Sequence, residues 1–264
     1  MEFVADCTRC VGLCCVALTR TRSGGFGADI PAGTPCHHLQ SDNGCEIHAT
    51  LRQDGWPACA AFDCFGAGQQ VTQVTFGGVA DWRDGTRTAG DMFTSFTMMR
   101  HLMEMLRLTT EAQGLAYGPA KERAEDLTER LTELVAASPG DLAAVDIGRL
   151  REETGRVLGE VSEQHRHPAR PSKRFKPRAQ LLGADLRDKD LSRYNLRGAL
   201  LIAADLTNAR LGRTDLLGAD LRDTNLAGAD LSETIFLTQQ QLDASRGTSD
   251  TVLPRGLTAP QHWY

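Results

Sequence analysis

The chain has 264 residues, 41% of them hydrophobic, and a formal net charge of −5 at pH 7. This balance indicates a soluble globular protein with room for two domains, and it excludes the strongly basic composition of a protein dedicated to nucleic acids. No apolar run approaches the ~18 residues that a membrane-spanning helix requires, so we expect no membrane contact. The opening MEFVADCTRC has neither the basic start nor the apolar run of a secretory leader. We therefore expect a cytoplasmic protein.

All eight cysteines lie within residues 7–64, together with three histidines. Disulfides and metal binding are the two chemistries that explain such a cluster. A reducing compartment disfavours disulfides, and a Cys-x2-Cys spacing lets two thiolates from one turn reach the same ion, as in many zinc sites. We predict a metal-binding module over residues 1–66. Its predicted ligands are Cys7, Cys10, Cys14, Cys15, Cys36, Cys45, Cys59 and Cys64.

The adjacent pair Cys14 and Cys15 limits the geometry of this module. Successive side chains point about 100° apart in a helix of ~3.6 residues per turn, and they also diverge in a strand. The two thiols should therefore not easily share one tetrahedral ion. The pair predicts a polynuclear centre or two nearby sites.

Charge balance adds further candidates. Eight thiolates around two divalent ions leave an excess of about four negative charges, which nearby cations or neutral imidazole ligands would reduce. Three arginines are available in this part of the sequence: Arg9, Arg20 and Arg22. His48 follows Cys45 at a ligand-like spacing and is a candidate ninth ligand, with a polar loop residue as the alternative. His37 and His38 are weaker candidates, because adjacent histidines often occur by chance.

The segments CTRCVGLCC, PAGTPCHHL, NGCEIH and CAAFDC resemble the CxxCxxxCC cysteine-cluster family over roughly residues 5–66. That family is regarded as zinc- or iron-chelating. The resemblance implies one or two zinc ions as the cofactor, with an iron–sulfur cluster as the alternative. This chain departs from the family by carrying His48 where a tyrosine often follows the cysteine at 45.

Residues 67–165 are predicted to form a helical region packed on this module. Apolar residues recur three and four positions apart in three segments between 88 and 165, which indicates three amphipathic helices. Gly114 and Gly118-Pro119 should separate the first two, and Ser138 should cap the third. The first helix is rich in methionine, which we interpret as core packing rather than a soft-metal site. A short strand is expected at 71–76.

Residues 166–178, RHPARPSKRFKPR, contain six Lys or Arg, three prolines and no acid. Proline at this density opposes helix and sheet. We predict a stiff, extended linker. The alternative is a patch for nucleic acid or an anionic surface.

From residue 179 the sequence repeats with a period of five. Leucine occupies every fifth position from 181 to 231, and Phe236 takes the next one. The residue two places before each leucine is usually Ala or Thr, with Lys189 and Tyr194 as the large exceptions. A period of five fits neither a helix nor a flat strand, so the pattern predicts a solenoid.

Residues 179–236 resemble the pentapeptide-repeat family, A(D/N)Lxx. The resemblance implies a right-handed four-sided β-helix of three coils with leucine at its axis, and a bulge or a contact with a partner at Lys189 and Tyr194. Residues 237–264 should form a helical cap over 237–245 and a tail anchored by Leu253, Leu257 and Trp263. The expected fold class is mixed: cysteine-rich metal-binding module, α-helical middle region and C-terminal quadrilateral β-helix.

These features favour a metal-binding protein whose solenoid offers an interaction surface to another protein. A metal- or iron–sulfur-dependent enzyme is the first alternative, but the sequence shows neither a Ser/His/Asp set nor a dinucleotide fingerprint, and we predict no catalytic residues. The resemblance adds a second alternative, a DNA mimic that protects topoisomerase. Residues 179–236 carry nine acidic and seven basic side chains, a net charge of −2, whereas ~15 Å of duplex DNA carries roughly nine charges. This weak charge ranks the mimic last and makes a nucleic-acid partner unexpected.

Overall fold

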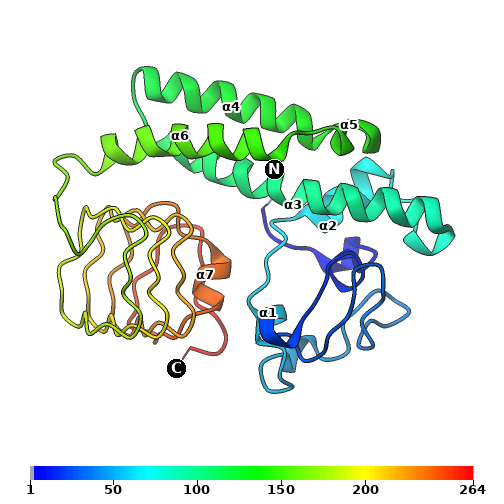
Figure 1. The fold of residues 1–264 in the computed structure, drawn as a ribbon, viewed down its shortest axis with the longest axis horizontal. Helices are drawn as coiled ribbons and strands as arrows, with labels where there is room; N and C mark the ends of the chain where they lie inside the picture. Colours follow the sequence, from blue (N-terminus) through cyan, green and yellow to red (C-terminus); the bar gives the residue numbers. More distant parts are fainter. Residues whose placement is uncertain (1–2, 264) are drawn as a thin grey trace. The chain divides into compact units, whose positions relative to one another are not determined.

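The chain divides after Leu158 in the computed structural model, which describes residues 3–263. The first unit, Met1–Leu158, contains the cysteine-rich segment and the helices that follow it, and the second, Gly159–Tyr264, contains the repeats (Figure 1). Within the described residues, no helix combines the length and the apolarity needed to cross a membrane. The finer domain boundaries expected at residues 66, 165, 178 and 236 stay predictions.

The cysteine-rich segment consists of loops and short helical turns. These turns are η1 (Cys7–Arg9), η2 (Leu13–Cys15), η3 (Arg22–Gly24), η4 (His48–Thr50) and α1 (Pro57–Ala60). Its apolar core is small and surrounds Trp56, whose ring packs against Gly27, where a Cβ would lie only 2.5 Å from the indole. So small a core leaves much of this segment to be stabilised by other interactions.

The strand expected at 71–76 is wrong. The short helix α2 (Ala67–Gln69) continues instead into η5 (Gln70–Thr75), a π-helical turn in which Phe76 N–H donates to the carbonyl of Val71 (3.0 Å). Val71 and Thr72 are both buried while Val74 is exposed, so burial does not alternate as it would in a strand.

The helical middle region is confirmed. After η6 (Trp82–Asp84), it contains α3 (Thr86–Leu115), α4 (Pro119–Val135), α5 (Pro139–Ala143) and α6 (Ile147–His165). The breaks fall where glycine and proline predicted them, and the Ser138 side chain accepts from Asp141 N–H (3.3 Å) as a helix cap. The third amphipathic segment is two helices, α5 and α6, rather than one. The long α3 packs against α4 and α5.

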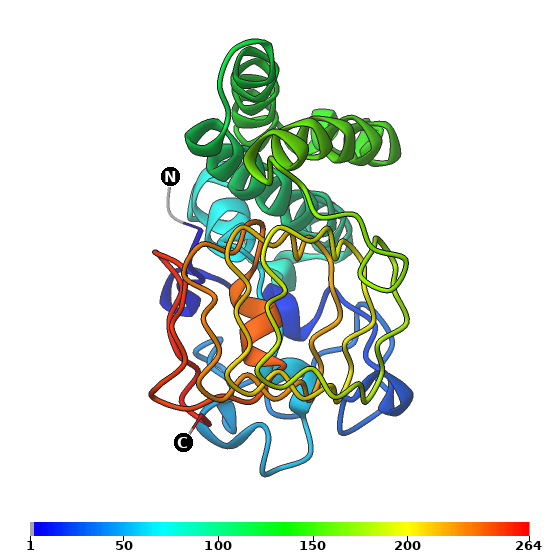
Figure 2. The same cartoon turned by 90° about the vertical axis from the view of Figure 1, so that its left-hand side faces the viewer.

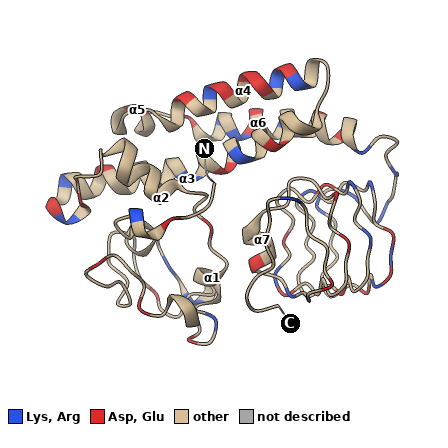
Figure 3. Ribbon diagram, turned by 180° about the vertical axis from the view of Figure 1, so that it is seen from behind, with Lys and Arg blue, Asp and Glu red and all other residues tan. Residues whose placement is uncertain are grey.

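Four of the five methionines of α3 serve as core residues. Met92, Met99, Met103 and Met105 are at most 5% exposed. Charged residues of both signs instead follow the outer side of α4 (Figure 3). One of them, Arg130, forms a bidentate ion pair with Glu153 of α6, at 2.6 and 3.1 Å. The stripe of apolar residues thus separates core from solvent as expected.

The repeats wind into stacked coils (Figure 2), and bridges that recur every five residues give each coil four sides. Parallel bridges join residues twenty positions apart, as in Asp185↔Asp205↔Asn225, and each coil makes such a bridge on each of its four sides. These bridges are isolated, and the described residues contain no longer strand. All eleven axial leucines and Phe236 are buried, at no more than 4% exposure. The predicted register is confirmed.

Every coil turns its corners with a left-handed residue. Positive φ angles recur at every fifth position from 183 to 228, at four glycines and six other residues. The N–H of such a residue bonds the next coil, as Gly183 does to the carbonyl of Ile202 (2.9 Å). The buried threonines beneath the leucines are also satisfied, since Thr214 Oγ1 donates to the carbonyl of Leu191 (2.7 Å).

The large residue at Tyr194 is met by the chain's own basic segment. Phe175 packs against the Tyr194 ring at 5.1 Å between centroids, and the Arg170 guanidinium lies 4.8 Å from the same ring. Arg170 also pairs with Asp190 (3.0 Å). Residues 166–178 therefore contact the first coil at several points.

The other end of the solenoid carries the predicted cap. Helix α7 (Gln239–Asp243) has a capping box formed by Thr238 and Gln241. Leu253, Leu257 and Trp263 pack on the solenoid core, which confirms them as anchors. The tail also extends the ladder of bridges at Asn225↔Arg246 and Asp230↔Val252. It thereby pairs part of the last coil's edge.

Candidate metal centre

All eight cysteines line one cavity of about 250 Å³ in the first unit. All eight are free thiols. His38, His48 and Arg20 line the same cavity. The structure therefore gathers the full set of predicted ligands, although positions 7 and 64 are far apart in the sequence. Among residues 3–263, no three Cys, His, Asp or Glu side chains already converge on a point where an ion would be held.

The expected divergence of Cys14 and Cys15 is wrong. Their Sγ atoms lie 3.8 Å apart. Both residues belong to η2, a tight 3-10 turn that follows the left-handed Gly12 (φ 71°). Zinc–sulfur bonds of ~2.3 Å give a tetrahedron with an edge of about 3.8 Å. The separation alone is thus compatible with one shared ion or with two neighbouring ions.

The first cysteines are held against the segment that follows Cys64. The side chain of Gln69 accepts from Asp6 N–H (3.1 Å) and donates to the carbonyl of Val4 (2.8 Å). The side chain of Gln73 donates to the carbonyl of Arg9 (2.8 Å). These bonds fix residues 4–9, and Cys7 with them, beside α2 and η5.

The later cysteines pack together around Trp56. Cys36 N–H donates to the carbonyl of Cys15 (2.9 Å), which joins two distant loops. Cys45 pairs with Leu39 in an isolated antiparallel bridge. Cys15, Cys36, Cys45 and Cys59 all belong to the apolar cluster of Trp56.

Burial is the main influence on the acidity of four of these thiols. It is the main cause that raises the pKa of Cys7, Cys10 and Cys45, and it raises that of Cys59 to about 12. The exception is Cys15, whose pKa is lowered to about 7 by the hydrogen bond from Cys14 and then by the charge of Arg20. The four thiols whose pKa is raised by burial thus keep their protons at neutral pH unless a cation displaces them.

Arg20 supplies a buried positive charge at this cavity. It is 2% exposed, and its guanidinium donates to the carbonyls of Cys14 (3.2 Å) and Thr34 (2.9 Å). Its Nε is buried without a hydrogen-bond partner. No ion pair with a carboxylate of the described residues compensates this charge. A buried charge without a counter-charge is strongly destabilising, so the cavity fits an anionic thiolate–metal group.

The histidines contribute one contact that sequence reasoning missed. His38 Nδ1 lies 3.5 Å from Glu46 Oε2, and its ring meets Trp56 edge-on at 5.5 Å. A carboxylate on one ring nitrogen is the usual partner of a metal-binding imidazole. In the sequence, the only indication of this contact is that Glu46 directly follows Cys45. Its pairing with His38 depends on the chain reversal between residues 38 and 46, which the Leu39↔Cys45 bridge closes. His48, the predicted candidate, lines the cavity from η4.

The repeats match a known family, and nearly the whole chain matches a Bacillus subtilis protein. Residues 178–216 and 199–236 match the family described as pentapeptide repeats (8 copies). The Bacillus subtilis (strain 168) protein with the name "Uncharacterized protein YybG" is 45% identical over 267 residues, which cover 99% of this chain and 95% of that protein. The likeness of residues 5–66 to the CxxCxxxCC family stays a prediction.

Two solved structures are similar to parts of this chain. The pentapeptide repeat protein Rfr23 of the cyanobacterium Cyanothece 51142 is 29% identical over 28% of this chain and 47% of that one, with a TM-score of 0.20. A pentapeptide repeat protein of Nostoc Pcc 7120 is 27% identical over 31% of this chain and 75% of that one, with a TM-score of 0.18. The alignment thus spans about half of Rfr23.

Proposed function

This chain belongs to the same family as YybG of Bacillus subtilis, and we propose that its amino-terminal unit binds metal while its pentapeptide-repeat solenoid binds another protein. The observation that carries the metal proposal is that all eight free thiols line the same cavity. Thiolates are the preferred ligands of zinc and of iron–sulfur clusters. Zinc is the proposed metal, as one or two ions, and an iron–sulfur cluster is the alternative.

The proposed role of the metal is structural. The core around Trp56 is small, and metal–thiolate bonds would join loops that few apolar contacts hold. Each thiol would release its proton to solvent as the ion binds, and Arg20 would offset the negative charge left behind. An open coordination position, which a catalytic zinc needs, is not required in this arrangement. We therefore favour a binding protein over an enzyme.

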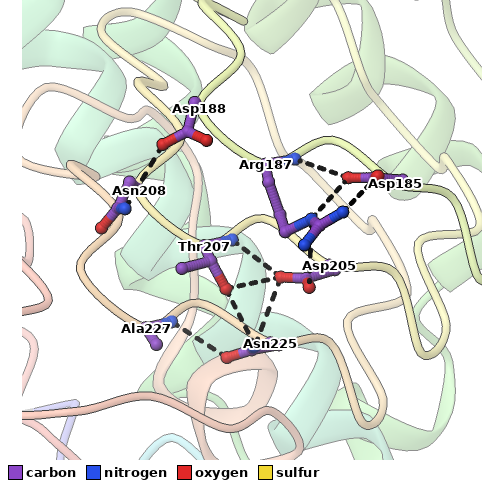
Figure 4. A network of polar contacts seen from close by, with 8 residues as sticks. All are labelled: Asp185, Arg187, Asp188, Asp205, Thr207, Asn208, Asn225 and Ala227. Carbon is purple, nitrogen blue, oxygen red and sulfur yellow. Dashed lines mark hydrogen bonds and ion pairs between the residues drawn. The ribbon is translucent and has the colours of Figure 1, made fainter.

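The proposed protein-binding surface is the outer face of the solenoid. Polar side chains form ladders there, as Figure 4 shows for Asp185, Asp205 and Asn225 on successive coils. Asn225 Nδ2 donates to Thr207 Oγ1 (2.9 Å), and Asp205 accepts from Thr207 N–H (3.0 Å). Such bonds hold the side chains in fixed positions, which lowers the entropy lost when a partner binds.

The DNA-mimic alternative is weaker because the solenoid's acids are largely paired with arginine. Asp185 pairs with Arg187 (2.7 Å) and Asp220 with Arg222 (2.6 Å), and in each pair the arginine lies two residues after the acid. A mimic of duplex DNA needs a dense, uncompensated negative charge. The cytoplasmic location expected from the sequence stays a prediction.

Metal analysis of the full-length chain, purified without air and without added metal, tests the proposal. We expect zinc at one or two ions per chain. Iron with sulfide and a visible absorption band would instead favour the iron–sulfur alternative. Absence of stoichiometric zinc and iron would overturn the metal-binding function. The matched control is a variant with Ser at all eight cysteines, which should hold no metal.

A further inference from the structure

We propose that the eight cysteines form two four-thiol sites, each for one thiophilic divalent cation such as zinc, and that Cys14 and Cys15 belong to different sites. The inference rests on the proposed metal-binding function. Site A consists of Cys7, Cys10, Cys14 and Cys64. Site B consists of Cys15, Cys36, Cys45 and Cys59.

Site B is defined by packing around Trp56. Its four cysteines share one apolar cluster with Ile30, Leu51 and Trp56, and none of the four cysteines of site A belongs to that cluster. The backbone bond from Cys36 to Cys15 holds the site together from both loops. Cys59 lies in α1, the short helix that begins directly after Trp56. There Ala60 N–H donates to the carbonyl of Trp56 (3.2 Å), which holds the helix to that residue.

Site A is defined by contacts with α2. A Cβ on Gly68 would lie 2.7 Å from Cys10 Sγ, so the sulfur lies against the helix backbone. Ala67 N–H donates to the carbonyl of Cys64 (2.9 Å), which places Cys64 at the start of the same helix. Cys10 N–H donates to the carbonyl of Cys7 (3.4 Å) at the end of η1.

The segment that carries Cys7 and Cys10 is also held to the residues that follow Cys64. Asp6 N–H donates to Gln69 Oε1 (3.1 Å), and Gln73 Nε2 donates to the carbonyl of Arg9 (2.8 Å). Val11 N–H donates to Thr72 Oγ1 (3.4 Å). We assign Cys14 to this group because it lies outside the Trp56 cluster.

The two groups of thiols meet at the adjacent pair. Cys15 Sγ lies 3.8 Å from Cys14 Sγ, while the Cys15 carbonyl accepts from the N–H of Cys36 in site B (2.9 Å).

Arg20 distinguishes the two sites. Its backbone pairs with that of Ile30, a member of the apolar cluster of site B, through two hydrogen bonds of 2.9 Å. Two ions with four thiolates each carry an excess of about two negative charges apiece. Site B has a buried arginine to offset that charge, and the other candidate cations, Arg9 and Arg22, are exposed.

Zinc counting in cysteine variants tests this division. The full-length chain is stripped of metal and titrated with Zn(II), and the bound ions are counted by native mass spectrometry. The unsubstituted chain should bind two. Cys10→Ser and Cys36→Ser should each keep one ion, and Cys10→Ser with Cys64→Ser, within site A, should also keep one. Cys10→Ser with Cys36→Ser, across the sites, should keep none.

The outcomes separate this inference from the proposed function. Loss of all metal in a single variant, or one iron–sulfur cluster per purified chain, overturns the two-site division and leaves metal binding intact. One ion retained in the cross-site variant overturns the assignment of residues. An unsubstituted chain that binds no stoichiometric metal overturns the proposed function itself.

A second variant, Arg20→Gln, tests the division without removing a proposed ligand. It therefore gives a result even if the cysteine variants misfold. It should weaken zinc binding about 10- to 100-fold, at one site only, and Arg20→Lys should recover part of that loss. Arg22→Gln is the matched control at an exposed arginine and should leave both affinities unchanged. Equal weakening of both sites, or of neither, overturns the link between Arg20 and site B.

Discussion

Cys10 Sγ lies directly against Gly68 of α2, where a Cβ atom would come within 2.7 Å of the sulfur. Gly68→Ala therefore displaces a proposed ligand without removing it. We expect weaker zinc binding, measured by competition with a chromophoric chelator, and a folded chain. Gly90→Ala, in α3 with nothing near its Cβ position, is the control and should leave zinc binding unchanged. Unchanged zinc affinity in Gly68→Ala would show that the position of Cys10 does not matter to the site.

Neither His38 nor His48 is needed as a ligand if eight thiols complete the coordination of two ions. His48→Ala and His38→Ala should both keep two zinc ions per full-length chain in native mass spectrometry. Glu46→Gln, which removes the carboxylate beside His38, should likewise keep both. If His38→Ala and Glu46→Gln each lost one ion while His37→Ala kept both, His38 would be identified as a ligand. That result would replace one of the eight thiols in the assignment.

The axis of the solenoid should not accept a charge. Leu206 is 0% exposed in the middle coil, and an unpaired carboxylate there costs several kcal/mol, roughly 3–5. Leu206→Asp should unfold the second unit or lower its urea midpoint strongly. Leu182→Asp makes the same chemical change at a leucine that is 54% exposed and should shift the midpoint little. Equal effects of the two changes would contradict the register.

Two glycines at equivalent corners should respond differently to alanine. Gly218 and Gly228 have φ of 62° and 66°, and alanine in this left-handed region costs about 1–2 kcal/mol. A Cβ at Gly218 meets open space, whereas one at Gly228 collides with the side-chain amide of Asn208. Gly228→Ala should therefore lower the free energy of unfolding, measured in urea, by more than Gly218→Ala does.

A second substitution checks the cause of that difference. Asn208→Gly removes the amide that the new methyl group meets, and it also relieves the left-handed strain at position 208 (φ 56°). Combined with Gly228→Ala, it should restore most of the extra loss. A double variant as unstable as Gly228→Ala alone would mean that backbone strain, not the collision, explains the effect.

The solenoid could be predicted from the sequence because the pattern that specifies it lies within each five-residue unit. Each five-residue unit repeats the same leucine, small residue and corner, so the axis at Leu206 and the exception at Tyr194 were both readable. The identity of the residue that meets Tyr194 was not readable. Phe175 reaches it from a proline-rich segment that has no periodicity.

The cysteine site was predictable in composition but not in arrangement. The positions of the cysteines in the sequence singled out the eight thiols that line the cavity. How these segments come together depends on hydrogen bonds between residues far apart in the sequence, such as Gln69 to Val4 and Gln73 to Arg9. Glutamines in a turn of helix carry no sequence signal for such a contact. The choice of Arg20 over its neighbours likewise depends on burial, which spacing does not reveal.

His101 of α3 should make the first unit less stable in acid. Burial, with the charges of Arg100 and Arg151, lowers its pKa to about 4, and its Nδ1 is buried without a partner. The ordinary pKa of histidine is ~6.5, so the unfolded chain binds more protons than the folded one between about pH 4 and 6.5. Stability from this residue is therefore complete above pH 6.5 and falls as the pH drops toward 4. His101→Gln should flatten the pH dependence of the melting temperature over that range, while His167→Gln, at an exposed histidine, should not. Identical pH profiles for His101→Gln and the unsubstituted chain would show that His101 titrates normally in the fold.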